Sequence, residues 1–262
     1  MISVVIPSRL AAMPDGRLWL ERALDCVRQQ RLPGGENVET VVGLDEGAEP
    51  PEPLITGYPG TRFVNADAAA PRGQAAALNA ALRTISGDWV ALLEDDDKWR
   101  SRHLELALGA LSALDFVSAS QRCVDPAGRQ IGVFGPATPS GWVMPRRVLD
   151  KVGPFDEAFR FHLDSEWLGR LNRAIARRGH FVEGSDLPLS QFLEKRPELR
   201  TLLDNVKPAQ IALLRGPGHY TQVVRTENPR GGVSSIKANK DLARISLGEY
   251  AAIERKYGHI PW

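Results

Sequence analysis

The chain has 262 residues and a formal net charge of +1, because 33 Lys and Arg residues nearly balance 32 Asp and Glu residues. Hydrophobic residues make up 43% of the chain, which is enough apolar surface for a core and excludes a mainly disordered protein. The balanced charge argues against a protein held to nucleic acid by bulk charge alone, although a local patch stays open. The length suits one large α/β domain or two small ones.

The two cysteines, Cys26 and Cys123, lie far apart and match no metal-ligand spacing. We therefore expect two reduced core thiols in a cytoplasmic protein. No apolar run is long enough to cross a bilayer, and the N-terminus lacks the basic start and long apolar stretch of a signal peptide. Residues 3–6 instead predict a buried strand that Pro7 ends.

Strands and helices alternate over the first hundred residues. Apolar runs predict strands at 3–6, 38–44, 61–64 and 89–93, and helical spacing predicts helices at 18–30 and 73–85. The proline-rich segment 49–53 predicts a loop. Strands that alternate with helices at this spacing predict a parallel sheet with helices on its faces.

The pattern is looser after residue 110. Further strands are expected at 116–119 and 130–134 around a turn at 125–128, with helices at 146–152 and 165–178. The strand signal fades from about residue 187, where helices at 199–206 and 242–256 flank a loop at 228–232. The segment 191–262 has twelve basic and seven acidic residues, a surplus that suits a solvated helical face or an anionic partner.

Four consecutive carboxylates, Glu94 to Asp97, directly follow an apolar strand. Carboxylates packed side by side repel one another and resist ionisation without a compensating cation. Hard oxygen ligands at the carboxyl end of a strand suit Mg²⁺ or Mn²⁺, which can bridge a diphosphate. A solvated acidic turn is the alternative interpretation.

Two other segments strengthen the first interpretation. Asp45 ends the second strand at the same edge of the predicted sheet, where a carboxylate can accept a hydrogen bond from a nucleobase. Arg72 and Gly73 precede the Ala-rich helix that contains Asn79, and a basic residue with free backbone donors at a helix start suits a phosphate. The alternatives are an ordinary turn residue and an exposed Arg.

Taken together, these segments resemble a family 2 glycosyltransferase of the GT-A fold. The matching segments, in chain order, are 3–8, 41–47, 72–82, 86–89, 92–99, 148–159 and 164–171, with a weaker match at 224–235. The resemblance implies a Rossmann-like, mostly parallel sheet flanked by helices. We expect a catalytic domain over 1–186, whose nucleotide-sugar half is about 1–100 and acceptor half about 101–186, and a mainly helical extension over 187–262.

The resemblance also implies roles on the donor side. Pro7 and Asp45 should line the nucleoside pocket, Asp95 should meet the ribose, and Asp96 should bind the cation that grips the diphosphate. Glu94 stands where the family usually has Asp. The full nucleotide-sugar set is Pro7, Ser8, Arg9, Asp45, Arg72, Asn79, Glu94, Asp95 and Arg225. The full set for Mn²⁺ or Mg²⁺ is Asp96, Asp97 and His219, where His219 is alternatively an ordinary loop histidine.

The catalytic base is expected near the start of the helix after residue 160. The family pattern selects Asp164, and Glu166 is its rival because the residue before Asp164 is Leu163 rather than the usual Glu. Two residues apart on a helix, the two carboxylates cannot point the same way. Arg225 belongs to a late segment, 224–235, that resembles a loop closing over donor phosphates.

The acceptor side is less defined. Trp142, with Gly141 before it, either stacks on an acceptor sugar or packs in the core. His103 is expected to have a structural role at the surface. The sequence leaves the acceptor open among glycan, lipid carrier, protein, small molecule and nucleic acid, and it leaves a homodimer open.

The expected reaction is a single inverting displacement, in which one carboxylate takes the acceptor proton and a metal ion stabilises the leaving diphosphate. A UDP-sugar is the favoured donor. Two alternatives stay open: a non-catalytic nucleotide-sugar-binding module of the same fold, and a nucleotidyltransferase. The latter would need a Gly-rich, Lys-containing loop near the N-terminus, and residues 7–12 are a poor version of one.

Overall fold

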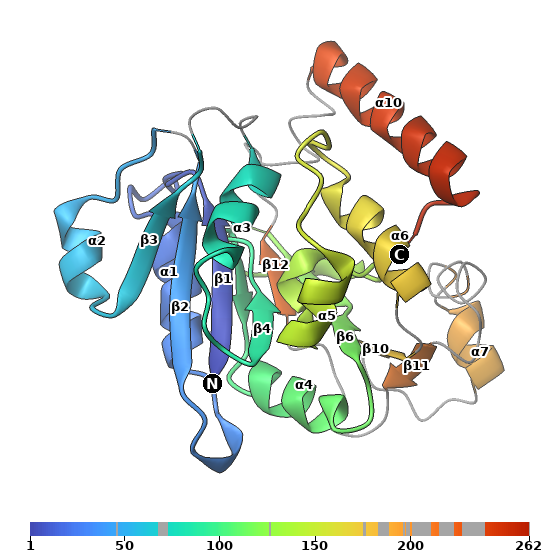
Figure 1. Ribbon diagram of the computed structural model, residues 1–262, viewed down its shortest axis with the longest axis horizontal. Coiled ribbons are helices and arrows are strands. Elements are labelled where there is room, and N and C mark those ends of the chain that lie inside the picture. The colour runs from blue at the N-terminus through green and yellow to red at the C-terminus, as the bar shows by residue number, and fades with distance from the viewer. Residues whose placement is uncertain are drawn as a thin grey trace.

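The computed structural model describes residues 1–45, 47–67, 73–125, 127–174, 177–182, 189–195, 197, 200, 211–214, 223–226 and 239–261. Within these residues, an eight-stranded sheet has the order β11-β10-β6-β9-β4-β1-β2-β3, and a four-stranded sheet has the order β5-β12-β7-β8. Helices flank the larger sheet (Figure 1). The expected α/β fold is therefore confirmed.

The N-terminal part of the large sheet is parallel. Its strands are β1 Ile2–Ser8, β2 Val38–Leu44, β3 Thr61–Asn65 and β4 Trp89–Leu92. β1 pairs in parallel with both β2 and β4, and all seven of its residues are buried, as an apolar central strand covered on both faces requires. The carboxyl ends of β1, β2 and β4 consequently meet at one edge.

The other half of the sheet mixes directions. Its strands are β6 Phe116–Ala119, β9 Val143–Pro145, β10 Arg178–Phe181 and β11 Ile211–Leu214. β9 is antiparallel to both β4 and β6, so it joins the two halves. The strands β9, β10 and β11 are short, and the sequence pattern did not predict them.

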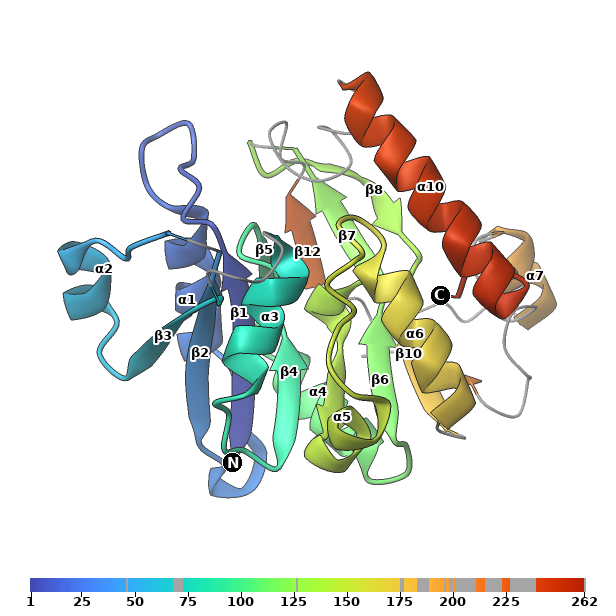
Figure 2. The same ribbon diagram turned by 45° about the horizontal axis from the view of Figure 1, so that its top comes forward.

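The small sheet consists of β5 Asp97–Trp99, β7 Gln121–Val124, β8 Gln130–Phe134 and β12 Val223–Thr226. Figure 2 shows β12 between β5 and β7. β12 is antiparallel to β5, and this register sets Arg225 opposite Asp97. The segment 187–262, expected to be mainly helical, thus also contributes one strand to each sheet.

The helices agree with the sequence pattern in most places. They are α1 Trp19–Arg28, α2 Glu52–Gly57, α3 Gln74–Leu82, α4 His103–Leu111, α5 Arg146–Val152, α6 Leu163–Ala174, α7 Leu189–Glu194 and α10 Lys240–Tyr257, with short 3-10 turns at Pro33–Gly35 and Pro139–Gly141. The expected loop at 49–53 is partly wrong, because α2 begins at Glu52 with proline in its first turn. The expected helix at 165–178 ends at Ala174 instead. The segments 201–210 and 227–238, which hold an expected helix and loop, lie outside the described residues.

Successive residues of β1 point to opposite faces of the sheet and so build two cores. Ile2, Val4 and Ile6 pack with α1 and α4, whereas Val5 packs with α3, α5 and α6. Helix α3 is Ala-rich because it lies very close to β2: a Cβ atom on Gly43 would come within 1.9 Å of the Ala77 carbonyl oxygen. This close approach fixes the start of α3 beside the strand ends.

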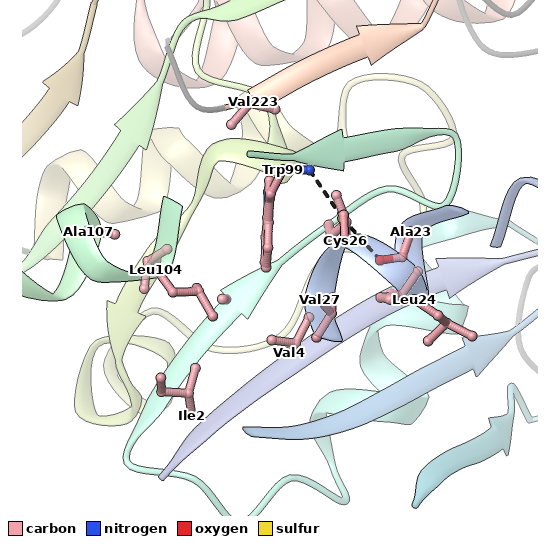
Figure 3. Close-up of a cluster of buried hydrophobic side chains, with 14 of the residues drawn as sticks. Ile2, Val4, Ala23, Leu24, Cys26, Val27, Trp99, Leu104, Ala107 and Val223 are labelled. Carbon is pink, nitrogen blue, oxygen red and sulfur yellow. Dashed lines mark hydrogen bonds between the residues drawn. The ribbon is translucent and has the colours of Figure 1, made fainter. Parts of the chain in front are cut away.

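The first core contains Cys26 and Trp99 (Figure 3). The Cys26 thiol donates to the Ala23 carbonyl (3.1 Å) and accepts from the Trp99 backbone N–H (3.2 Å), and burial raises its pKa to about 11. Cys26 and Cys123 are both free thiols, as expected, although Cys123 is only half-buried. The surface role expected for His103 is wrong, because its ring is buried and stacks on Trp99 at 4.5 Å.

None of the described helices has the length and apolar character needed to cross a membrane.

Candidate functional site

An acidic turn, defined as residues 94–97, connects β4 to β5 at the carboxyl edge of the sheet. The strand before it is held by a hydrogen bond from the Leu93 N–H to the Val5 carbonyl (3.0 Å). Ser140 holds the turn itself, because its hydroxyl accepts from the Glu94 N–H (3.0 Å) and its carbonyl accepts from the Trp99 indole N–H (2.6 Å). The four carboxylates are thus fixed by the fold and do not form a loose solvated turn.

Two carboxylates of the acidic turn, Glu94 and Asp95, accept few hydrogen bonds. Glu94 accepts from the Gln74 amide (3.0 Å) and, more weakly, from the Ser140 hydroxyl (3.4 Å). Burial raises its pKa, and Asp96 adds to the increase while Arg225 opposes it. Asp95 accepts a 2.6 Å bond from the Ser8 hydroxyl, yet burial and the charge of Asp96 raise its pKa to about 7.

Asp97 is the extreme case. It is 1% exposed, and neither of its carboxylate oxygens has a hydrogen-bond partner of normal geometry in the described part of the chain. Burial, with the charges of Asp96 and Glu94, raises its pKa well above the ordinary value, and nearby Arg225 and Ser140 offset only part of this. The acidic turn is therefore short of positive charge.

Two cations do approach the turn. Arg225, on β12, lies opposite Asp97; burial disfavours its charge, but Glu94, Asp97 and Asp96 together raise its pKa. Arg22, on α1, donates a 2.6 Å hydrogen bond to the Asp96 carbonyl and lies over the Trp19 ring. Sequence reasoning missed Arg22. The available signal was its place on the same stripe as buried Trp19 and Cys26, where a charge needs a partner.

The donor-side residues meet at the ends of β1 and β2. Pro7 and Ser8 end β1, and the Ser8 hydroxyl accepts from the Leu10 N–H (3.0 Å) while its carbonyl accepts from the Asp45 N–H (2.9 Å). The Asp45 carboxylate accepts from the Gly73 N–H (3.0 Å) at the start of α3. Arg9 is exposed beside them, and its charge opposes the raised pKa of Asp95. The predicted nucleotide edge is therefore spatially contiguous.

Leu10 has a backbone φ of +57°, the left-handed region that a branched side chain seldom adopts. It directly follows the donor-side residues Ser8 and Arg9, and its N–H is held by the Ser8 hydroxyl. Such outliers persist where the surrounding structure fixes them and are frequent at binding sites.

Three predicted site residues have structural roles instead. Asn79 is buried, and its amide exchanges hydrogen bonds with the Phe155 backbone (both 2.9 Å) and donates to Glu157 (2.8 Å), so it joins α3 to the loop after α5 and does not reach the nucleotide edge. Trp142 is fully buried and stacks with Trp167 and Phe155, which rules out stacking on an acceptor sugar. A Cβ atom on Gly141 would come within 2.8 Å of the Ala119 nitrogen, so this glycine serves close packing.

The two candidate bases separate cleanly. Asp164 is half-buried in the first turn of α6. Burial raises its pKa to about 6, and the charges of Glu94 and Arg225 act on it, so it belongs to the acidic turn's surroundings. The Glu166 side chain is 1% exposed and contacts Lys256 (2.8 Å), Arg170 (2.9 Å) and the Tyr257 hydroxyl (3.0 Å). Burial favours its neutral form, but these partners hold its pKa below the ordinary value.

Arg72 and His219 lie outside the described residues. Among the residues that are described, no group of three or more His, Cys, Asp or Glu side chains forms a metal cluster by itself.

The sequence profile of glycosyl transferase family 2 matches residues 3–152, more than half of the chain. The chain belongs to glycosyl transferase family 2. Family membership classes it as a glycosyltransferase, as the sequence resemblance implied, and the matched region contains the whole acidic turn and donor edge. No curated protein sequence matches the chain significantly.

Solved structures of the same fold include glycosyltransferases. S. aureus TarS 1-349 in complex with UDP-GlcNAc has a TM-score of 0.58 at 14% identity, covering 95% of this chain and 66% of that one. The mannosyltransferase PcManGT from Pyrobaculum calidifontis, in complex with GDP-Man and Mn2+, has a TM-score of 0.58 at 17% identity, covering 97% of this chain and 64% of that one. This family 2 chain spans less than two thirds of the length of these chains, and only 39% of a longer TarS chain.

Proposed function

We propose that this protein transfers a sugar from a nucleoside-diphosphate sugar, most favourably a UDP-sugar, to an acceptor hydroxyl with inversion. The observation that carries the proposal is the convergence at one sheet edge of the acidic turn, Arg225 and Asp164. TarS in complex with UDP-GlcNAc and PcManGT in complex with GDP-Man and Mn2+ share this fold, which supports a nucleotide-sugar donor.

The donor would lie along the ends of β1, β2 and β4. Asp45 would accept a hydrogen bond from a nucleobase N–H. It directly follows β2, beside Pro7 and Ser8 at the end of β1. Asp95, fixed by Ser8, is placed to accept from a ribose hydroxyl. Arg225 would stabilise negative charge on the departing diphosphate, since it lies opposite Asp97 and its positive charge interacts with the acidic turn.

The acidic turn fits Mn²⁺ or Mg²⁺. Its carboxylates have few hydrogen-bond donors, and among the described residues Asp97 has none of normal geometry. A divalent cation would therefore relieve their mutual repulsion. Asp96 is our principal ligand, with the diphosphate supplying further oxygens. When bound there, the cation would stabilise the charge that develops on the leaving diphosphate.

Asp164 is our general base. It would take the proton of the acceptor hydroxyl at its carboxylate while that oxygen attacks the anomeric carbon. Its pKa of about 6 makes it ionised at neutral pH and more basic than an ordinary Asp, which suits proton abstraction. Glu166 is not our base, because Lys256 and Tyr257 of α10 and Arg170 of α6 hold its carboxylate.

Calorimetry tests the donor and metal parts together. UDP should bind wild-type protein more tightly with Mn²⁺ than without it, and Asp96→Asn should remove most of that difference. Asp88→Asn is the matched control, because Asp88 precedes the same strand at its opposite end and is exposed. Equal metal dependence in wild type and Asp96→Asn would take Asp96 out of the site, and no UDP binding at all would contradict the proposed function.

A further inference from the structure

Helix α10 contacts the segment just before α6 with three residues of one helical face. Ser246, Glu249 and Tyr250 follow the spacing of neighbours on a helix surface, and all three meet residues 160–162. Figures 1 and 2 both show α10 alongside α6. Helix α10 therefore contributes side chains to the surroundings of Asp164, although it is remote from Asp164 in the sequence.

Glu249 is the anchor of this contact. Its buried carboxylate accepts hydrogen bonds from three consecutive backbone N–H groups, those of Arg160 (2.7 Å), Phe161 (2.9 Å) and His162 (3.0 Å). Bonds from several backbone donors to one carboxylate fix the chain direction at the entry to a helix. Residues 160–162, and with them the position of the Asp164 backbone, are thus set by α10.

Tyr250 and His162 form a ring pair at the outer side of this contact. Their ring centroids lie 3.7 Å apart, and the His162 ring is also bonded to the Ser246 hydroxyl (2.7 Å). The pair is therefore rigidly oriented, yet Tyr250 remains 37% exposed. Burial raises the pKa of the Tyr250 hydroxyl and the charge of Asp164 adds to the increase, which agrees with a position beside Asp164.

We infer that Tyr250 and His162 form an acceptor subsite that takes a neutral pyranose ring, stacked on the exposed part of the Tyr250 ring. The inference rests on the proposed function. If Asp164 accepts the proton of the acceptor hydroxyl, the acceptor must lie against Asp164, and Tyr250, which stacks on His162 two residues before Asp164, offers a partly exposed aromatic ring near it. The acceptor is then a glycan or a glycoside.

The chemistry of the Tyr250 ring and the charge around it favour a neutral sugar as the ligand. A pyranose has an apolar C–H face that packs on an aromatic ring and hydroxyls that need polar neighbours, and tyrosine offers an apolar body with a polar tip. Two carboxylates, Asp164 and Glu249, adjoin the ring pair. Their negative charge disfavours a polyanion such as nucleic acid at the same place.

Saturation-transfer NMR with methyl glycosides of glucose, mannose and N-acetylglucosamine tests the inference. The protein is first saturated with UDP and Mg²⁺, and glycerol serves as a probe with hydroxyls but no ring. We expect at least one glycoside to receive saturation on its C–H face, and Tyr250→Ala to weaken its binding about tenfold, as losing one stacking contact implies. Tyr250→Phe should retain binding because it keeps the ring.

Leu247→Ala is the matched control, since Leu247 is a 69% exposed apolar residue on the same helix, and it should bind the glycoside as wild type does. The inference is overturned if no glycoside binds, or if glycerol or a short single-stranded RNA binds as well as a glycoside does. It is also overturned if Tyr250→Ala binds the glycoside normally, or if Tyr250→Phe loses as much glycoside affinity as Tyr250→Ala. UDP affinity, measured on the same samples, separates the two proposals: failure of UDP to bind wild type refutes the proposed function, whereas failure of the glycosides alone refutes this subsite.

Discussion

The described part of this molecule has buried carboxylates in two regions, and the number of their hydrogen-bond and charge partners differs between the two. At the α6–α10 junction, Glu166 has three cationic or hydroxyl partners and Glu249 has three backbone donors. In the acidic turn, Asp95 accepts one side-chain bond and Asp97 none among the described residues. The first region holds the fold together, whereas the second is left short of partners that a ligand could provide.

The pKa values express the same contrast. Partners hold the pKa of Glu166 below its ordinary value against the effect of burial, so the charged form is the stable one there. Burial and like charges raise the pKa of Asp95 and Asp97, so their charged forms are disfavoured in the protein alone. The perturbed carboxylates that gather at this sheet edge make it the candidate functional site.

The largest expected effect is on Asp164. Asp164→Asn should lower the rate of sugar transfer by at least ~100-fold, the usual scale for losing a general base, while UDP affinity stays as in wild type. Because the base must be ionised and its pKa is raised to about 6, the wild-type turnover rate should rise with pH through about that value. Turnover and UDP calorimetry check both, with exposed Asp150→Asn as the control.

A weakened UDP affinity in Asp164→Asn would mean that Asp164 belongs to the donor side instead.

Glu166→Gln probes the structural region. It should lower the free energy of unfolding by about 1–3 kcal/mol at neutral pH, because its three partners lose a buried charged acceptor. Folded molecules should keep most of their transfer activity. Since the folded pKa lies below the ordinary 4.5, the wild-type advantage is present above that value and lost as pH falls through the folded pKa.

Urea unfolding across pH measures this. A loss of transfer as severe as that of Asp164→Asn, in protein that is still folded, would exchange the two roles.

Asp97→Asn should act in the opposite direction on stability. Removing a buried carboxylate that lacks donors should raise the free energy of unfolding by roughly 0.5–2 kcal/mol in metal-free protein, the range of ordinary stabilising changes. The folded pKa of Asp97 is raised, so wild-type stability falls as pH rises, and the gain should be larger at about pH 8 than at about pH 5.

The same variant should reduce the coupling between Mn²⁺ and UDP. A destabilised Asp97→Asn protein, seen in the same urea unfolding series, would show that the acidic turn is as structural as the α6–α10 junction.

The smallest expected effect is a pH-dependent ligand shift. Mn²⁺ with UDP should raise the Tm by at least about 2 °C more at about pH 8 than at about pH 5.5, because protons compete for a ligand set. Asp95 sets the window: its pKa is about 7, so above that value its charge, next to Asp96, adds to the attraction for the cation. Thermal unfolding with Asp96→Asn as the control checks this, and a shift independent of pH would remove the acidic carboxylates from the metal site.

Local patterns in the sequence determined much of this protein. The apolar runs of β1, β2 and β4 predict strands because a central parallel strand is buried on both faces, and carboxylates after such runs must meet at one edge. Helical spacing likewise predicted α1, α3 and α10. The acidic turn and Asp45 were therefore readable as one site from sequence alone, and the family resemblance added Asp164.

Only the tertiary structure decided which polar residues face that site. Asn79 and Trp142 both lie within the region that the family profile matches, yet Asn79 bonds to the Phe155 backbone and Trp142 fills the core. Arg225 reaches the acidic turn only because β12 pairs with β5. Helix geometry alone turns Asp164 and Glu166 apart, but only the contacts of Glu166 with Lys256 and Tyr257 of α10 show that Glu166 is the structural one of the two. Such pairings join residues far apart in the chain, so no local periodicity encodes them; packing and charge balance in the folded molecule select them.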